Sequence, residues 1–287
     1  MSKHLKADLS LLLATAIWGS SFTLIKNVID HIPTFAYLSL RFIIASIILI
    51  AVFYKKLKYI NKKAVIYGCI IGLMLFGGMA LQVSGLYFTS ASNSAFITGL
   101  NVIMVPLFSS AILKKKPDRS SVIGVILAFA GLFFLTGGLD FRFNIGDFLT
   151  LLCAVCFALQ IIFIDRYNKE QDPIILTLIQ ISFTALLNTV VWLFIDYKPV
   201  VINANVAFTL FATAVLGTAI AYLIQTVAQK HTTPTHTALI FTAEPVFAAF
   251  FAMIIPNSNG TVESLSLNTI IGCALILAGT LICELRK

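Results

Sequence analysis

One carboxylate stands inside an apolar run in the last quarter of the chain. Glu244 is the only Asp, Glu, Lys or Arg in the segment 233–251, and Pro245 follows it directly. A charge at the centre of a membrane helix costs about 2.5–3.5 kcal/mol on insertion scales, so it normally faces a protein interior or a wet cavity. Pro245 lacks a backbone donor and weakens a helix. Glu244 could therefore bind a substrate amine or a proton, or it could satisfy backbone donors freed at a helix break.

An earlier apolar segment, 90–109, repeats this pattern. When the two segments are aligned, Asn101 falls opposite Glu244, and Pro106 falls about one turn later than Pro245 would require. Asn101 could bind substrate or join helices, since interhelical polar contacts are common in membranes. Two such segments predict a duplicated membrane protein with a site between its halves.

Further polar and aromatic residues lie at mid-span positions. Gln82 and Gln225 occupy matching places in the two halves. Trp18 lies in the middle of an apolar run rather than at an interface, where tryptophan is usual. Its ring could stack on a flat or amino-acid substrate, or pack against lipid or a neighbouring helix. We expect the substrate site to contain Trp18, Gln82, Asn101, Tyr222, Gln225 and Glu244.

Other residues fit a gating or structural role better. Arg41 is expected to pair with a carboxylate or with carbonyl groups at a helix end. His236 lies near the expected cytoplasmic end of its span, where it could titrate, although an interfacial position is the favoured interpretation. The expected gating or structural set is Ser21, Arg41, Pro106, Gln160, His236 and Pro245.

Cysteines and histidines do not form a metal or redox motif. All five cysteines lie in apolar runs, and Cys153 and Cys156 form a CxxC without the fold of a redox protein. We interpret them as small packing residues. No metal ion and no cofactor are expected.

The elements that must position these residues are membrane helices. Apolar residues make up 59% of the chain and charged residues 11%, whereas a soluble domain has about 25% charged residues. About 20 apolar residues span a bilayer as a helix, so the chain of 287 residues has room for about ten spans. The predicted spans are 7–29, 34–54, 64–86, 91–113, 121–138, 145–164, 173–195, 205–227, 235–255 and 265–283.

The basic residues predict the orientation of these spans. The net charge of +8 sits in short loops, so it reflects topology rather than nucleic-acid binding. Nearly all Lys and Arg residues lie on the side of the two termini, which are therefore expected to be cytoplasmic. Five spans in each half would insert in opposite senses. We predict an all-α membrane protein with ten transmembrane helices, built as an inverted five-plus-five repeat of units 1–138 and 139–287.

Several stretches together resemble a known family. They are IWGSSFTLIK, LRFIIA, LQVSGLYFTSASNSAFITGLNVIMVPL and AYLIQTVAQKHTTPTHTALIFTAEPVFAAFF. In order and spacing they are similar to the drug/metabolite transporter (DMT) superfamily, in its ten-helix EamA-type branch. The resemblance covers essentially the whole chain. It implies an inverted repeat, alternating access and small-molecule cargo, commonly amino acids and related metabolites, often exported.

These observations predict a multi-pass transporter of the cell (inner or plasma) membrane, and not an enzyme. Its expected partners are a small-molecule substrate and the lipid bilayer, without nucleic acid. Nucleobases, sugars or organic cations remain alternative substrates. A non-transporting sensor or scaffold and an intramembrane enzyme are alternatives of other classes. Proton coupling, through Glu244, and oligomeric state stay open.

Overall fold

The computed structural model describes residues 3–26, 32–89, 94, 97–114, 117–135, 144–195, 197–255, 262 and 266–285. Every regular element within these ranges is a helix. The elements are α1 (Lys3–Lys26), α2 (Thr34–Val52), η2 (Tyr54–Tyr59), α3 (Lys62–Leu86), α5 (Asn101–Leu113), α6 (Arg119–Leu135), α7 (Ile145–Tyr167), α8 (Pro173–Phe194), α9 (Ala204–Ala214), η3 (Val215–Ile220), α10 (Ala221–Ala228), η4 (Gln229–His231), α11 (Pro234–Phe241), α12 (Glu244–Ala252) and α13 (Leu267–Leu285).

Six of the described helices are long and apolar enough to cross a membrane. They are Thr34–Val52, Lys62–Gly85, Ile145–Tyr167, Pro173–Phe194, Ala204–His231 and Pro234–Ala252. Three shorter apolar helices are Ile97–Leu113, Arg119–Leu135 and Leu267–Cys283. The all-helical membrane fold is confirmed, and the expected count of ten spans is taken up below as a proposal.

Two of the predicted spans are not uniform α-helices. The predicted span 205–227 contains a π-helical turn, η3, between α9 and α10. The predicted span 235–255 is divided by a turn at Thr242 and Ala243 into α11 and α12. Pro245 stands at the start of α12, a position that suits proline because its missing N–H would have no partner there.

Side chains from the loops fix where several helices begin. At each of these positions a side-chain oxygen accepts a backbone N–H of the first turn, which would otherwise lack a partner. Asn144 and Asp147 do this reciprocally, as a capping box at the start of α7. The other capping residues are Asn61, Asp172, Asn203 and Thr233.

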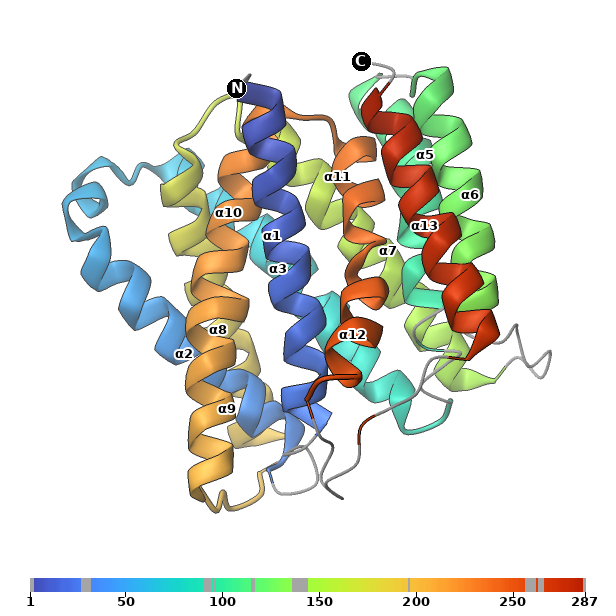
Figure 1. Ribbon diagram of the computed structural model, residues 1–287. Helices are drawn as coiled ribbons and strands as arrows, with labels where there is room; N and C mark the ends of the chain where they lie inside the picture. The colour runs from blue at the N-terminus through green and yellow to red at the C-terminus, as the bar shows by residue number, and fades with distance from the viewer. Residues whose placement is uncertain are drawn as a thin grey trace.

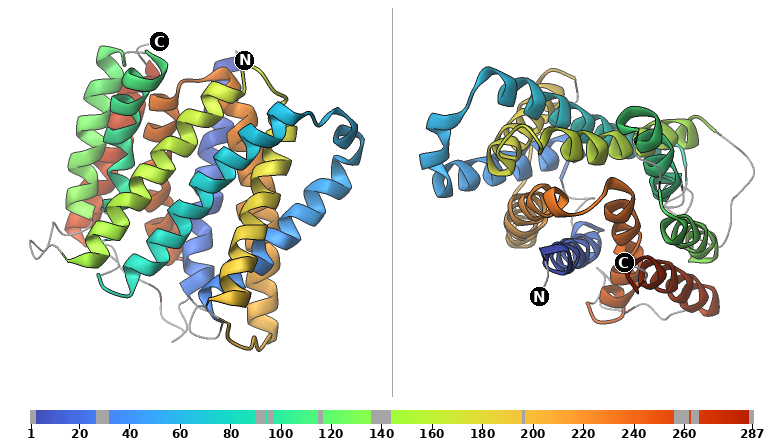
Figure 2. Two further views of the ribbon diagram at one scale, coloured as in Figure 1. Left: turned by 180° about the vertical axis from the view of Figure 1, so that it is seen from behind. Right: turned by 90° about the horizontal axis from the view of Figure 1, so that it is seen from above.

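The helices run beside one another in a bundle (Figure 1). On one face α3 lies against both α7 and α8, and on the other face α1 lies against α12 and α10 (Figure 2). The most extensive packing joins α6 to α13, while α2 packs on α8. Each of these contacts joins a helix from the first part of the chain to one from the second.

Glycines allow the close approach of α6 and α13. A Cβ added at Gly131 would lie 2.7 Å from the carbonyl oxygen of Gly272, and one added at Gly124 would lie 2.7 Å from that of Gly279. No side chain larger than hydrogen fits at such a crossing without moving the helices. Small residues permit this close approach, as they do between many membrane helices.

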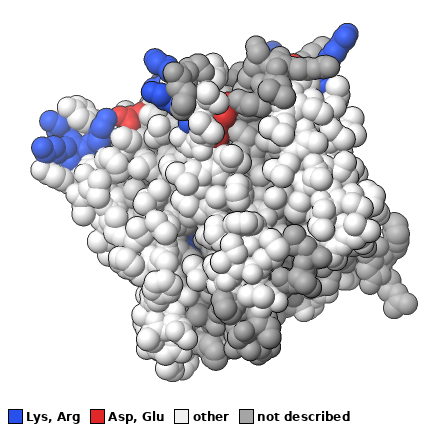
Figure 3. All heavy atoms as spheres, viewed as in Figure 1, with Lys and Arg blue, Asp and Glu red and all other residues white. Residues whose placement is uncertain are grey.

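The surface is apolar around the middle of the bundle and charged at one end. Lys and Arg side chains gather at the end where both termini lie, and the belt beneath them is almost entirely uncharged (Figures 1 and 3). Large apolar side chains such as Phe208 and Phe211 of α9 are 65% and 61% exposed. A soluble protein rarely shows so much exposed apolar surface, whereas a lipid-facing one does.

Candidate functional site

Glu244 is the first residue of α12 and follows the turn that divides the predicted span. In that turn the N–H of Ala243 donates to the carbonyl of Ile240 at 3.0 Å, which is tighter than an α-helical turn. The Glu244 side chain is partly exposed. Among the described residues, none donates a hydrogen bond to its carboxylate. Glu244 therefore presents an acceptor for a ligand or a proton at a break in the helix.

The π-helical turn η3 exposes a backbone carbonyl to side chains of the first half. Trp18 Nε1 donates to the carbonyl of Gly217 at 2.8 Å, and Arg41 Nη2 donates to the same oxygen at 3.2 Å. Arg41 Nε also donates to Thr218 Oγ1 at 2.6 Å. A π-turn displaces the i→i+4 hydrogen-bond ladder, which leaves this carbonyl free for α1 and α2.

Aromatic rings surround the point where α1 meets α10 and α11. The Trp18 ring lies 5.2 Å from the Tyr222 ring and 5.0 Å from the Phe241 ring, the latter edge to face. Phe42 extends the group, with its ring 6.4 Å from that of Tyr222. Tyr222 is 6% exposed. The stacking surface predicted for Trp18 is thus occupied in this conformation by two protein rings.

A cation and a carboxylate lie in the same region. Arg41 is 5% exposed and is near enough to Glu244 and Tyr222 to act on both electrostatically, without an ion pair to Glu244 within 4 Å. The backbone of Gly19 on α1 lies against the carbonyl of Glu244, since a Cβ at Gly19 would come within 2.9 Å of that oxygen. One cation, one carboxylate and several aromatic rings therefore converge from α1, α2, α10, α11 and α12. Such a set can hold a small molecule that carries both charges.

Ser21 belongs to the edge of this cluster. Its hydroxyl donates to the carbonyl of Ile17 at 2.8 Å, within α1. A Cβ added at Gly217 would lie 3.1 Å from Ser21 Oγ and 3.1 Å from Arg41 Nη2. Ser21 and Arg41, both expected in a gating or structural role, thus flank the π-turn together.

Gln160 and Gln225 form a second, fully buried cluster. Gln225 Nε2 donates to Gln160 Oε1 at 3.0 Å, and Gln160 Nε2 donates to Gln180 Oε1 at 3.5 Å. Gln180 Nε2 then donates to Thr226 Oγ1 at 3.0 Å. The three amides are 1%, 3% and 0% exposed for Gln225, Gln160 and Gln180. This chain of amides joins α7, α8 and α10, as interhelical polar contacts do in membranes.

Gln82 and Asn101 lie elsewhere in the first half. Gln82 Nε2 donates to Thr98 Oγ1 at 3.3 Å, and both side chains are partly buried. Asn101 is the first residue of α5, just as Glu244 is the first residue of α12. Pro106 is buried within α5. The alignment of Asn101 with Glu244 therefore pairs two residues that each begin a helical segment inside a predicted span.

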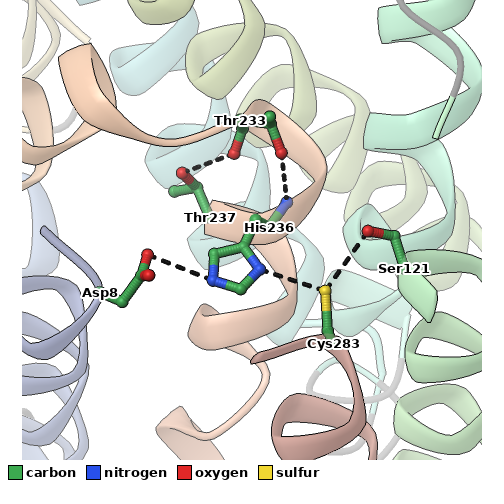
Figure 4. A network of polar contacts seen from close by, with 6 residues as sticks. All are labelled: Asp8, Ser121, Thr233, His236, Thr237 and Cys283. Atoms are coloured by element: carbon green, nitrogen blue, oxygen red, sulfur yellow. Dashed lines mark hydrogen bonds and ion pairs between the residues drawn. The ribbon is translucent and has the colours of Figure 1, made fainter. Parts of the chain in front are cut away.

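His236 is buried inside the bundle, and its position near the membrane interface stays a prediction. It is 1% exposed, with Nε2 3.2 Å from Asp8 Oδ1 and Nδ1 3.1 Å from Cys283 Sγ (Figure 4). Cys283 Sγ also lies 3.3 Å from Ser121 Oγ. Thr233 caps α11 by accepting the backbone N–H of His236, which fixes the start of the helix that carries the imidazole. The two ring nitrogens therefore face partners on α1 and α13.

Sequence reasoning missed several members of these clusters. The π-turn at Gly217 and Thr218 has no sequence signal that we recognise. Asp8 did have a signal, since it is a carboxylate near the start of the first predicted span. Cys283 and Ser121 resemble ordinary packing residues. In the described part of the chain, no three His, Cys, Asp or Glu side chains converge on one point as metal ligands.

Comparisons with known proteins agree with this architecture. The model of the EamA-like transporter family matches the chain twice, over residues 5–137 and 144–284. The chain is 34% identical to an uncharacterized transporter of Archaeoglobus fulgidus over 99% of its own length and 87% of that protein's. It is 29% identical to the uncharacterized transporter YyaM of Bacillus subtilis over 97% of its own length and 93% of that protein's. A solved crystal structure shares the fold, with a TM-score of 0.80 at 20% identity over 99% of this chain and 98% of the other.

Proposed function

Because this chain belongs to the EamA-like transporter family, within the DMT superfamily, we propose that it moves small organic metabolites by alternating access. The favoured substrates are amino acids or related compounds, and the favoured direction is export. The observation that carries the substrate class is that Arg41 and Trp18 share the Gly217 carbonyl while the backbone of Gly19, next to Trp18, lies against Glu244. A free amino acid carries a carboxylate and an ammonium group, which the Arg41 and Glu244 side chains complement.

The proposed architecture is a ten-span inverted repeat of units 1–138 and 139–287. Two matches of one family model, one in each half, support it. The packing pairs support it too. In the proposed repeat α1, α2, α3 and α6 correspond to α7, α8, α9–α10 and α13. Exchanging the halves therefore turns the contact of α3 with α7 into that of α10 with α1. The same exchange turns the contact of α3 with α8 into that of α9 with α2, and it maps the pair α6 and α13 onto itself.

The glycine crossing supports the same symmetry. Gly124 and Gly131 on α6 have the spacing of Gly272 and Gly279 on α13. Exchanging the halves turns the contact of Gly124 with Gly279 into the contact of Gly272 with Gly131, and both contacts occur. In an inverted repeat the substrate site lies near the bilayer midplane, between the halves. The cluster around Gly217 combines residues of both halves, as that arrangement requires.

The charge distribution supports cytoplasmic termini in a cell membrane. The described Lys and Arg side chains gather at the end that holds both termini (Figure 3). Among the described residues at the other end, the basic ones are Lys26, where α1 ends, and Lys198, in the segment before α9. Positively charged loops remain on the cytoplasmic side.

The roles follow from the geometry. Arg41 uses two of its five N–H groups on Gly217 and Thr218, so the guanidinium is held in place while retaining donors for a substrate carboxylate. Glu244 receives the substrate ammonium group, or a proton when the site is empty. Trp18 and Tyr222 supply aromatic faces. Gln82, Asn101 and Gln225 lie outside this cluster in the described conformation, and their place in the substrate site stays a prediction.

A second candidate substrate is an organic cation. A carboxylate next to Trp18, Tyr222 and Phe241 is suited to a cation held against aromatic faces. Binding of an organic cation needs the Glu244 carboxylate and the aromatic rings but not Arg41. Transport of the two substrate classes should therefore differ in its dependence on the Arg41 guanidinium.

Counterflow in proteoliposomes tests the proposal. Purified protein would be assayed with a panel of labelled amino acids and one of organic cations, alongside Glu244→Gln, Arg41→Gln and the control Asp165→Asn. This control replaces the Asp165 carboxylate, which is buried on α7 and paired with Lys169, by an amide of the same shape. Saturable amino-acid exchange that both site variants abolish and the control retains is the expected result.

Other results would change the assignment. Exchange of cations that depends on Glu244 but not on Arg41 would replace the substrate class. If Glu244→Gln keeps substrate exchange but loses pH-driven substrate accumulation, Glu244 is the site of proton coupling. No exchange of any compound by folded protein would contradict the substrate proposal altogether.

A further inference from the structure

Four buried polar side chains form a continuous chain at the end of the bundle that holds both termini (Figures 1 and 4). Asp8 of α1 meets His236 of α11, His236 meets Cys283 of α13, and Cys283 meets Ser121 of α6. Their exposed fractions are 6%, 1%, 2% and 3% in that order. The chain therefore ties four helices together away from the Arg41 and Glu244 cluster.

The imidazole is the centre of this chain because its two nitrogens face different helices. Nε2 lies 3.2 Å from Asp8 Oδ1, and Nδ1 lies 3.1 Å from Cys283 Sγ. His236 stands on α11, the piece of helix between the capped start at Thr233 and the turn at Thr242 and Ala243. Beyond that turn lies α12, which begins with Glu244. A contact that holds α11 to α1 thus acts on the helix next to the proposed substrate carboxylate.

We propose that Asp8 and His236 form a proton-responsive latch that closes this end of the transporter between α1 and α11. The proposal rests on the alternating-access function given above. In a low-dielectric interior the attraction between an imidazolium and a carboxylate is strong. Adding a proton to Asp8 or removing one from His236 cancels one charge of the pair. The latch therefore holds while both groups are charged and loosens when either is neutralised.

Other charged groups lie around this pair within the described residues. On α1, Lys3, His4 and Lys6 are exposed, and on η4, which packs against α1, Lys230 is exposed and His231 is partly exposed. Of the remaining helices against α11, α5 has no titratable side chain, α6 has the exposed Arg119, and α13 contributes Cys283. In the last turn of α7 the charged residues are Asp165, which is paired with Lys169, and Arg166. The titratable partners in contact with His236 are thus Asp8 and Cys283.

The same residue types could suggest a cysteine nucleophile with a histidine base. The geometry opposes this, since Cys283 and His236 are 2% and 1% exposed, so the thiol is closed to a substrate. Their burial instead makes Cys283 a natural reporter of the latch. A thiol reagent reaches it only when α1, α11 and α13 separate.

The test measures the alkylation rate of Cys283 by N-ethylmaleimide. All other cysteines, Cys69, Cys153, Cys156 and Cys273, would be replaced by alanine, and rates would be normalised to the same protein unfolded in detergent. The variant Asp8→Asn keeps the shape of the side chain and removes its charge. We expect it to label about three- to fifteenfold faster, the range given by interhelical polar contacts. Asp8→Glu keeps the charge and should label like the parent protein.

Matched controls separate the latch from general loosening. Asp165→Asn should leave the labelling rate unchanged. A protein with Cys273 as its single cysteine, on the same helix but outside the network, should label at one rate with or without Asp8→Asn. In a His236→Gln background, Asp8→Asn should raise the labelling rate of Cys283 by a smaller factor than it does in the parent, because the two residues act as a pair.

A parent-like labelling rate for Asp8→Asn would overturn the proposal, as would full additivity with His236→Gln. If Asp8→Asn fails to fold, the pH dependence of labelling in the parent protein tests the proposal instead. Its normalised labelling rate should rise at least about threefold as Asp8 is protonated in acid, and a flat profile would overturn the proposal. The labelling needs no substrate, so absence of counterflow would contradict the proposed function while leaving this result intact.

Discussion

Replacing Gly19 by alanine should push α1 away from α12 at the residue that carries Glu244. A Cβ at this position would lie 2.6 Å from Phe247 Cβ, 2.9 Å from the backbone nitrogen of Ala248 and 2.9 Å from the carbonyl oxygen of Glu244. Two of these three atoms belong to the backbone of α12, so a change of rotamer cannot relieve the overlap. The helices themselves must move.

The size of the effect follows from these distances. Carbon atoms pack at about 3.5 Å or more, so the axes of α1 and α12 must separate by about 1 Å. Overpacking of this kind costs about 1–3 kcal/mol of unfolding free energy. The melting temperature should fall by roughly 3–10 °C. Because the displaced residue is the proposed ligand for the substrate, the exchange rate should fall about tenfold or more.

Thermal unfolding in detergent and counterflow in proteoliposomes measure the two effects. The matched control is Gly77→Ala, since a Cβ there would meet just the side chain of Cys156, at 3.2 Å from Sγ. We expect the control to stay close to the parent in both assays. A Gly19→Ala protein with parent melting temperature and parent exchange would refute the reasoning that the contact of α1 with α12 positions Glu244.

Three further predictions concern other contacts. Trp18→Phe removes the hydrogen bond to the Gly217 carbonyl and should lower the unfolding free energy by about 0.5–1.5 kcal/mol, which denaturant unfolding measures; an unchanged midpoint would contradict it. Gly131→Ala places a Cβ 2.7 Å from a carbonyl oxygen of α13 and should cost about 1–3 kcal/mol by the same measurement; a cost near zero would show that α6 and α13 separate freely. Burial acts to raise the pKa of Asp172, but hydrogen bonds from Lys56 and a backbone N–H outweigh it and hold that pKa below its ordinary value. A lowered folded-state pKa stabilises the protein above the unfolded-state pKa of about 3.9, and this stabilisation is lost as the pH falls through the folded-state pKa. The melting temperature of Asp172→Asn should therefore depend less on pH below about 4 than that of the parent. An equal pH dependence in the two proteins would contradict this.

Much of the fold could be predicted from the sequence because a bilayer leaves few choices. Long apolar runs must be helices there, since each backbone group needs an internal partner. Loop residues such as Asn61, Asn144 and Asp172 mark helix starts for the same reason, and each does cap a helix. Glycines repeated along an apolar helix indicate close packing, as Gly124 and Gly131 do.

Individual candidates for the site could also be found, because a polar residue in an apolar run is costly unless it has a partner. Trp18 and Glu244 stood out in this way as substrate ligands and Arg41 as a gating or structural residue, and the structure places all three around the same contact of α1 with η3 and α12. The sequence did not separate them from Gln160 and Gln225, which meet each other on different helices. The cost of burying a polar group requires that a partner exist, but it does not identify the partner.

The tertiary structure decided those partners and the irregular backbone between them. The π-turn at Gly217 supplies the carbonyl that Trp18 and Arg41 share, although 199 and 176 residues separate them from it along the chain. The helix break falls at Thr242 and Ala243 rather than at Pro245, because proline begins a helix more easily than it continues one. His236 turned out to be buried because Asp8 and Cys283 reach it from two other helices. The sequence by itself determined which side chains needed partners, and helix packing determined which ones they received.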